Sequence, residues 1–130
     1  MNPQAASGRA RAGRLSRSAD FERVYRNGRS HSNRHLVLYS FPRGEHDTPR
    51  LGVSVSRKVG GAVDRNLVKR LLREAFAAHA SELAGGCDYV VVARPDAREL
   101  AERDGLAGVD AALAELLSAS APPAAGEVAG

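Results

Sequence analysis

The chain of 130 residues has a single cysteine, Cys87, which excludes a disulfide within the chain. Small proteins that depend on disulfides are usually secreted, so the lone thiol favours a reducing compartment. Its place before an apolar run predicts a buried, inert side chain. A chain of this size does not need crosslinks, because a domain of about 150 residues buries roughly 68–70% of its unfolded surface. We therefore expect one domain with a hydrophobic core.

The sequence also has no apolar run near the ~18 residues that a membrane helix requires. Its first residues, MNPQAASGRARAGR, carry arginines without a following apolar segment, so they do not resemble a secretory signal. We expect a cytoplasmic protein with no membrane partner.

Spacings typical of hydrolytic and metal-binding enzymes are absent as well. The acids show no D-x-D spacing, and no Ser-His-Asp arrangement can be assigned. Gly60-Gly61 matches neither a P-loop nor a dinucleotide-binding G-x-G-x-x-G. The sequence therefore predicts no catalytic residue and no metal ligand within the chain.

Positive charge is present in excess, but only in the first part of the chain. Residues 1–73 contain 16 basic and 5 acidic side chains, a net +11, and residues 74–130 contain 3 and 10, a net −7, which together give +4. A division of this size indicates a polyanionic partner.

Hydrophobic periodicity predicts one domain over residues 14–117. We expect residues 1–13 to form a disordered basic arm and residues 118–130 a disordered Pro/Ala/Gly-rich tail. Ser18 is the expected N-cap of a first helix, which Asn27-Gly28 ends. The expected helices cover residues 19–27, 64–81 and 109–117, and the expected strands cover residues 34–41, 50–57 and 89–93.

The strand patterns also predict how the sheet is built. Both faces of the strand over residues 34–41 are apolar, with Val37 and Tyr39 on one and Leu36 and Leu38 on the other. The strand over residues 50–57 is its expected hairpin partner. The continuously apolar run YVVVA is typical of a central strand, and it completes a βαβ unit with the preceding strand and helix.

The most informative segment is RKVGGAVDRNLVKRLLREAF, residues 57–76. At about 100° per residue, its hydrogen-bond donors fall on one face of the helix and its apolar residues on the remainder. The donors, which we call the cationic ridge, are Arg65, Asn66, Lys69, Arg70 and Arg73. The apolar residues are Leu67, Val68, Leu71, Leu72, Ala75 and Phe76.

Two interpretations of the cationic ridge are open. Most charged helix faces are only solvated, but such faces mix signs to gain pairs worth about 0.2–0.5 kcal/mol each. Here acids stand only at the edges, at Asp64 and Glu74, and cations near a helix N-terminus oppose the helix dipole. Arginine forks, Asn66 and backbone N–H groups after the Gly60-Gly61 pair can together bind phosphate, so we favour that function.

A second candidate surface combines aromatic and apolar residues of the first helix and first strand. These residues, which we call the aromatic cleft, are Phe21, Tyr25, Val37 and Tyr39. Such stripes usually belong to the core. The same residue types can stack bases of single-stranded nucleic acid, at about 1–3 kcal/mol per base, and the basic neighbours favour this alternative. These neighbours are Arg23, Arg26, Arg29 and Arg34.

Taken together, these segments resemble the protein subunit of bacterial ribonuclease P. The pattern K-x-G-x-A-V-x-R-N-x-x-K-R-x-x-R-E-A-F of that family is met from Lys58 to Phe76. The resemblance continues in the family's order through RLSRSADFERVYRNGRS, NRHLVLY, RLGVSVS and DYVVVARP, over residues 14–95. The chain departs from the family at Asp64 and Leu67, where basic residues are frequent, and in its acidic C-terminal part.

The resemblance implies a fold and two binding surfaces. The fold is a two-layer α+β sandwich of a mixed β-sheet with helices, in the order αβββαβα, with a left-handed βαβ crossover in place of the usual right-handed one. The third strand of that order is not evident in this sequence. The implied contacts to the catalytic RNA are the cationic ridge with Arg57, Lys58, Asn33 and Arg34. The aromatic cleft would hold the 5′ leader of precursor tRNA.

The implied function is that of an accessory subunit in an endoribonuclease whose catalytic centre lies in the RNA. Its partners would be the catalytic RNA and precursor tRNA, with Mg²⁺ bound mainly by the RNA and no organic cofactor. A non-catalytic ribosomal-RNA-binding protein is the alternative, since it would share the basic face without needing the aromatic cleft. A self-sufficient nuclease would require an acidic metal site, which the sequence does not show.

Overall fold

The structure, a computed structural model, describes residues 13–42, 48–83 and 86–120. Residues 1–12 of the predicted arm and residues 121–130 of the predicted tail lie outside the described residues. Both predicted boundaries need correction. Gly13 pairs with Arg50 in a short strand, and residues 118–120 continue the last helix, so regular structure extends beyond residues 14–117.

Five strands form one mixed sheet in the order β1-β4-β5-β3-β2. Their bounds are β1 Gly13–Arg14, β2 Arg29–Ser32, β3 Leu36–Pro42, β4 Arg50–Ser54 and β5 Cys87–Ala93. The central position of β5 confirms the prediction from its apolar run, because a strand with neighbours on both sides and helices on both faces needs apolar residues throughout.

The predicted hairpin between the strands at residues 34–41 and 50–57 is wrong. β5 lies between β3 and β4, antiparallel to β3 and parallel to β4. The hairpin partner of β3 is β2, whose four polar residues RSHS show no alternation that could predict a strand. β2 supplies the third strand of the order αβββαβα, and β1 precedes that order.

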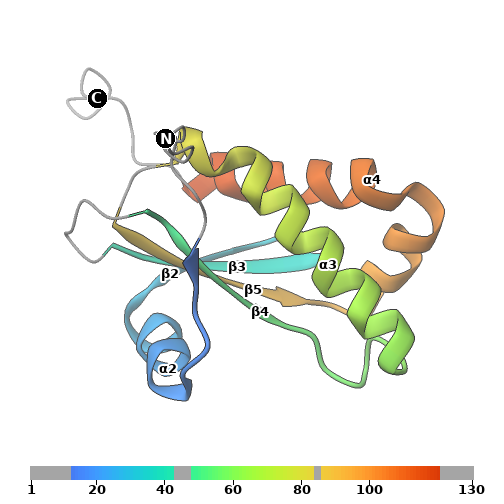
Figure 1. Ribbon diagram of the computed structural model, residues 1–130, viewed down its shortest axis with the longest axis horizontal. Helices are drawn as coiled ribbons and strands as arrows, with labels where there is room; N and C mark the ends of the chain where they lie inside the picture. Colours follow the sequence, from blue (N-terminus) through green and yellow to red (C-terminus); the bar gives the residue numbers. More distant parts are fainter. Residues whose placement is uncertain (1–12, 43–47, 84–85, 121–130) are drawn as a thin grey trace, which may run out of the picture.

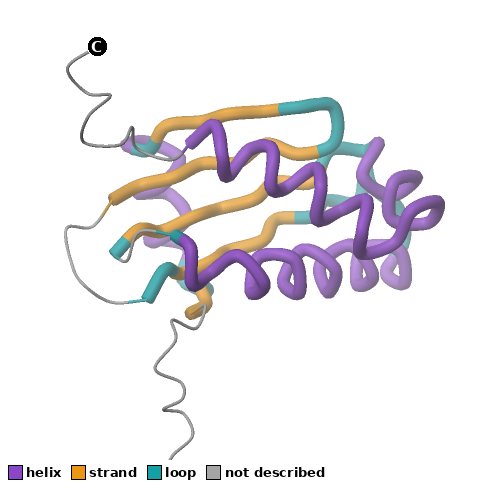
Figure 2. Tube along the Cα trace, turned by 90° about the horizontal axis from the view of Figure 1, so that it is seen from above, coloured by secondary structure: helices purple, strands orange, loops and turns teal. Residues whose placement is uncertain are grey.

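Helices cover both faces of the sheet, unequally. α3 (Ala62–His79) and α4 (Asp96–Ser120) lie side by side on one face, and the shorter α2 (Ser18–Asn27) lies against part of the other (Figures 1 and 2). A 3-10 turn, η1 (Ala80–Glu82), ends α3. The α+β class and the parallel β4–α3–β5 unit are confirmed, and the handedness of this crossover stays a prediction.

The core confirms the predicted faces of β3 and α3. Leu36 and Leu38 are fully buried beneath α3 and α4, whereas Tyr39 and Phe41 pack on the opposite face with Val24 of α2. The apolar side of α3 supplies five fully or almost fully buried side chains, and Leu67 packs at their edge. These five are Val68, Leu71, Leu72, Ala75 and Phe76.

The helix boundaries differ from the prediction, least for α3, which covers residues 62–79 where the sequence predicts 64–81, and most for α4. α2 begins at Ser18 itself, with Arg17 in the N-cap position and no side-chain capping bond. α4 begins at Asp96 rather than near Val109, and its two halves meet at Gly105, whose φ of 61° is unfavourable for residues with a side chain. The first half is not evident in the sequence because its acidic residues surround few large apolar ones.

Candidate nucleic-acid interface

The cationic ridge lies along the solvent side of α3. Asn66 and Arg70 are exposed, and Arg65, Lys69 and Arg73 are half-buried, one turn apart from one another. The Nε atom of Arg65 donates to the carbonyl oxygen of Gly60 at 3.2 Å, which holds this guanidinium at the start of the helix. The predicted division of α3 into a core side and a cationic side is thus confirmed.

Acidic partners are scarce along the ridge. Arg70 pairs with Glu74 across one exposed turn, at 3.2 Å. Within the described ranges, no carboxylate lies at ion-pair distance from Arg65, Lys69 or Arg73. On a helix face that is only solvated, acidic side chains would pair with these basic ones for stability. The absence of such pairs in the described ranges favours an external anion as the partner.

The two departures from the family pattern do not interrupt the ridge. Asp64 is half-buried and lies 3.8 Å from the guanidinium of Arg98, on α4. Leu67 packs against the hydrophobic core. Both side chains therefore point away from the donors of the ridge.

One end of the sheet gathers further cations. The β2–β3 turn, the β4–α3 loop and the end of β5 meet there, because β3 runs antiparallel to β4 and β5. Arg57 and Lys58 lie exposed in the β4–α3 loop, which is anchored by buried Val59. Exposed Arg94 follows β5 at the same end, and the sequence prediction omits it although it stands in the family-like run DYVVVARP.

Asn33 and Arg34 lie in the β2–β3 turn at this end, at the opposite edge of the sheet from β1. The Asn33 side chain donates to the Ala112 carbonyl and to Glu115, both at 3.0 Å, and accepts from the backbone N–H groups of His35 and Leu36. These bonds give Asn33 a role in the turn. Arg34 is exposed and donates to Asp96 at 3.1 Å. The structure does not bring this pair to the ridge.

The aromatic cleft forms on the face of the sheet that carries α2. The ring centroids of Tyr25 and Tyr39 lie 4.9 Å apart and those of Phe21 and Tyr25 lie 6.3 Å apart, both edge to face. Val37 lies on the same face of β3, half-buried beside its partner Val92. The structure thus brings all four predicted residues to one surface.

This surface is partly core and partly open. Phe21 and Tyr39 pack against the small cluster around Val24, as the core interpretation predicts. Tyr25 keeps 39% of its area exposed and borders a hollow of about 430 Å³ beside α2. Burial raises the pKa of the Tyr25 hydroxyl, and a hydrogen bond with Ser54 partly opposes this. A stacked base could reach Tyr25.

Gly52 of β4 explains how α2 approaches the sheet so closely. A Cβ atom at this position would lie 2.5 Å from the ring of Phe21. Any larger residue would therefore displace the ring that begins the aromatic cleft.

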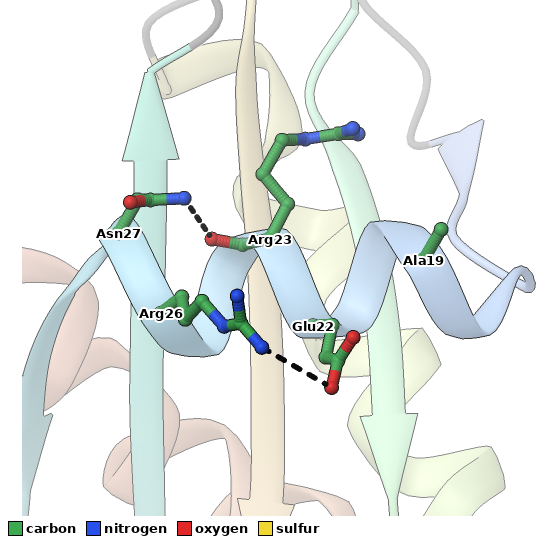
Figure 3. A pocket seen from close by; sticks show the side chains of 5 residues that line it. All are labelled: Ala19, Glu22, Arg23, Arg26 and Asn27. Atoms are coloured by element: carbon green, nitrogen blue, oxygen red, sulfur yellow. Dashed lines mark hydrogen bonds and ion pairs between the residues drawn. The ribbon is translucent and has the colours of Figure 1, made fainter.

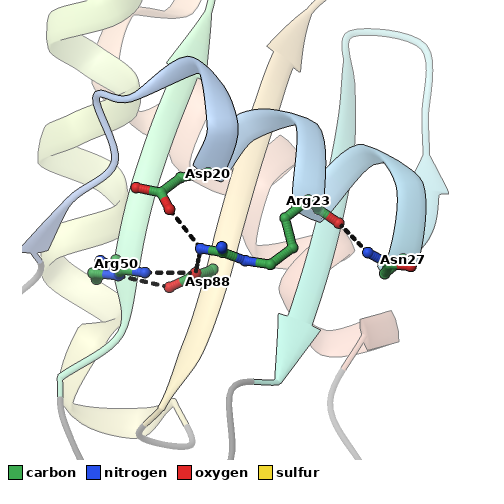
Figure 4. A network of polar contacts seen from close by, with 5 residues as sticks. All are labelled: Asp20, Arg23, Asn27, Arg50 and Asp88. Carbon is green, nitrogen blue, oxygen red and sulfur yellow. Dashed lines mark hydrogen bonds and ion pairs between the residues drawn. The ribbon is translucent and has the colours of Figure 1, made fainter.

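A buried carboxylate fixes α2 on the sheet (Figure 4). Asp88 of β5 is fully buried and accepts two hydrogen bonds from the guanidinium of Arg50, both at 2.8 Å. Arg23 of α2 lies 4.0 Å from the same carboxylate and also bonds to Asp20. This network ties the helix that carries Phe21 and Tyr25 to the central strand.

The outer side of α2 is less cationic than its sequence indicates (Figure 3). Arg26 lies 3.8 Å from Glu22, and the Asn27 amide donates to the Arg23 carbonyl at 3.2 Å. With the Arg23 guanidinium turned toward the sheet, little uncompensated charge is left on this side of the helix.

The described ranges show no group of three or more His, Cys, Asp or Glu side chains that could hold a metal ion. His79 pairs with Asp110 of α4 at 2.9 Å and so contributes to helix packing. The sequence predicts that Cys87 is buried, and the structure shows it half-buried. None of the helices in these ranges is long and apolar enough to span a membrane.

Comparisons with known proteins agree with this geometry. The family model "Ribonuclease P" matches residues 10–117. The ribonuclease P protein component of Shouchella clausii is 45% identical over 91 residues, which cover 70% of this chain and 75% of that protein. The solved ribonuclease P protein of Staphylococcus aureus superposes with a TM-score of 0.73 at 38% identity, covering 82% of this chain and 93% of that one. The Thermotoga maritima protein gives 0.73 at 35% identity, covering 82% and 96%. The chain therefore belongs to the ribonuclease P protein family.

Proposed function

We propose that this protein component of ribonuclease P binds the catalytic RNA along the cationic ridge and the 5′ leader of precursor tRNA at the aromatic cleft. In this role it assists the endonucleolytic removal of the leader, which produces the mature 5′ end of tRNA in the cytoplasm. The observation that supports it best is the presence, on opposite faces of one sheet, of two different surfaces suited to nucleic acid.

The ridge is suited to a folded RNA backbone. Arg65, Lys69 and Arg73, which have no carboxylate partner among the described residues, lie one turn apart, at about 6 Å spacing along the helix. Guanidinium groups bind phosphate oxygens with two parallel hydrogen bonds, and such contacts fix position without reading sequence. Arg57 and Lys58 extend this positive surface to the start of α3.

The aromatic cleft is suited to a single strand. Stacking on Tyr25 and its ring partners tolerates any base, as a leader of varying sequence requires. The β4–α3 loop, which carries exposed Arg57 and Lys58, leaves the sheet at the end where its cations gather and leads to the ridge face. A substrate leader could therefore pass from the RNA subunit to the cleft while remaining beside positive charge.

The chemical step belongs to the RNA in this proposal. The described acids do not gather into a metal site, and the ridge is cationic, so Mg²⁺ would be held mainly by RNA phosphates. The contribution of this chain is to neutralise phosphate charge and to hold the leader. Both effects lower the Mg²⁺ concentration at which the RNA can bind its substrate.

A ribosomal-RNA-binding protein would bind RNA along the ridge and would not use the aromatic cleft. A substitution in the cleft therefore distinguishes the two functions. We expect Tyr25→Ala, in the reconstituted holoenzyme, to weaken binding of leader-bearing precursor tRNA about 5- to 150-fold, the equivalent of 1–3 kcal/mol of stacking. Mature tRNA should bind as before. The matched control is Leu106→Ala on α4, since Leu106 has a similar exposure of 42%. Equal effects of Tyr25→Ala on both RNAs would assign the aromatic set to the core alone.

A further inference from the structure

A hollow at the edge of the sheet lies beyond both predicted surfaces. It is lined by Gly13, Arg14, Leu51, Arg73 and Ala77 and has a volume of about 350 Å³. Arg14 is not among the predicted RNA-binding residues. Its position on β1 places it next to the C-terminal half of α3.

The sheet register explains why Arg14 and Arg73 meet. β1 runs parallel to β4, with Arg14 beside Leu51, and the bond from the Leu15 N–H to the Leu51 carbonyl measures 2.9 Å. Neighbouring residues of paired strands project to the same face. Leu51 is buried in the core beneath α3, so the side chain of Arg14 also projects toward α3, where Arg73 and Ala77 lie one turn apart.

The two guanidinium groups repel each other. The pKa of Arg73 is lowered by burial and, to a smaller extent, by the positive charge of Arg14. In the part of the chain that the structure describes, no carboxylate lies within ion-pair distance of either group. Most other described arginines of the helices and sheet do have a carboxylate partner, as Arg50, Arg70 and Arg98 show.

Two arginines that share a hollow without a described carboxylate form a site for an anion. Their planar forks match the tetrahedral oxygens of phosphate, and a bound phosphate would relieve their repulsion. Arg73 is also the last cation of the ridge, one turn beyond Lys69. The same RNA backbone that follows the ridge would therefore arrive at this hollow.

We infer that Arg14 and Arg73 together bind one backbone phosphate of the RNA subunit, so that the RNA-binding surface crosses from α3 onto the edge strand β1. This inference rests on the proposed function and extends it to a residue from outside the helix.

The test is a salt titration of binding to a bacterial ribonuclease P RNA, with Arg14→Gln, Arg73→Gln and the double variant. The slope of log K against log[salt] is negative, and loss of one phosphate contact should make it less steep by about one unit. The same loss should weaken binding about eightfold at about 0.1 M salt. Because the two residues share a phosphate, the double variant should lose about one unit of slope and not two. The matched control is Arg103→Gln, since exposed Arg103 already pairs with Asp104 at 3.0 Å.

Stability gives a second readout. Arg14→Gln removes the repulsion, so the free protein should melt at the same or a higher temperature while it binds RNA less tightly. If Arg73→Gln does not fold, Arg73→Lys keeps the charge but not the fork and should lose part of the affinity. Inorganic phosphate, added to the free protein, tests whether the hollow binds a free anion in preference to the RNA backbone.

The possible outcomes separate the two proposals. A salt slope for Arg14→Gln equal to those of the wild type and Arg103→Gln would overturn the inference, and so would a loss of two units in the double variant. A rise in melting temperature with inorganic phosphate, together with an unchanged RNA slope, would assign the hollow to a free anion. If Arg65→Gln also leaves RNA binding unchanged, the proposed function itself fails.

Discussion

At the residue scale, carboxylate partners divide the cations of this molecule into two groups. Arg23, Arg50 and Arg98 each pair with a carboxylate of another element and so hold elements together. Arg65 and Lys69 have no such partner in the described ranges, although carboxylates are available elsewhere on the surface. The second group is therefore the one available to RNA phosphates.

We expect Arg65→Gln and Lys69→Gln each to lower the salt slope of RNA binding by about one unit, because each removes one phosphate contact. Arg70→Gln should have a smaller effect, since Glu74 already competes for that guanidinium at 3.2 Å. Titrations monitored by filter binding or fluorescence anisotropy would measure these slopes. Slopes that stay unchanged within error in the first two variants would show that the ridge is only solvated surface.

At the element scale, the position of α2 depends on the buried Asp88 network. Asp88→Asn removes the charge that Arg50 and Arg23 contact. We expect the free energy of unfolding to fall by about 2–3 kcal/mol, because a paired buried charge is lost while Arg50 keeps some access to solvent. Urea unfolding measures this change. Asp96→Asn is the matched control, and its exposed pair with Arg34 should cost less than about 1 kcal/mol.

The same variant should also affect function selectively. A displaced α2 moves Phe21 and Tyr25 but leaves α3 in place, since the two helices lie on opposite faces of the sheet (Figure 1). We expect Asp88→Asn to weaken binding of the leader more than binding of the RNA subunit. An equal loss of both affinities would contradict a role for the network in positioning α2.

The break in α4 makes a separate prediction about stability. Gly105 has a φ of 61°, and a Cβ atom added there would point into open space, so substitution meets only a backbone cost. Gly105→Ala and Gly105→Asn should each lower the free energy of unfolding by about 1–3 kcal/mol, because the ψ of −147° places Gly105 outside the left-handed helical region that asparagine tolerates. Thermal or urea unfolding of both variants and of the wild type would measure these losses of stability. Equal stability of the alanine variant and the wild type would show that α4 can straighten.

The sequence predicts the elements that carry strong local patterns and misses those that do not. α2, α3 and β5 follow from periodicity and an apolar run. β2 is polar and only four residues long, and β1 has two residues, so their strand conformation depends on pairing with β3 and β4. The error in the β3–β4 pairing has the same cause, because β5 enters between them from far along the chain.

At the scale of the whole molecule, the divided charge becomes a division in space. α4, which carries much of the acidic excess, packs over β2 and β3, and the ridge side of α3 reaches the opposite edge at β1. The predicted ridge and aromatic cleft could be found from helical and strand periods. Arg14 could not, because only the β1–β4 register brings it to Arg73.

In the proposed function, this chain enables an RNA enzyme to act on precursor tRNA. The most direct measurement is the rate of precursor-tRNA cleavage by a bacterial ribonuclease P RNA at low Mg²⁺, with and without this protein. We predict that the protein raises the turnover, and that a variant carrying both Arg65→Gln and Lys69→Gln raises it less. Turnover that does not change when the wild-type protein is added would contradict the proposed function.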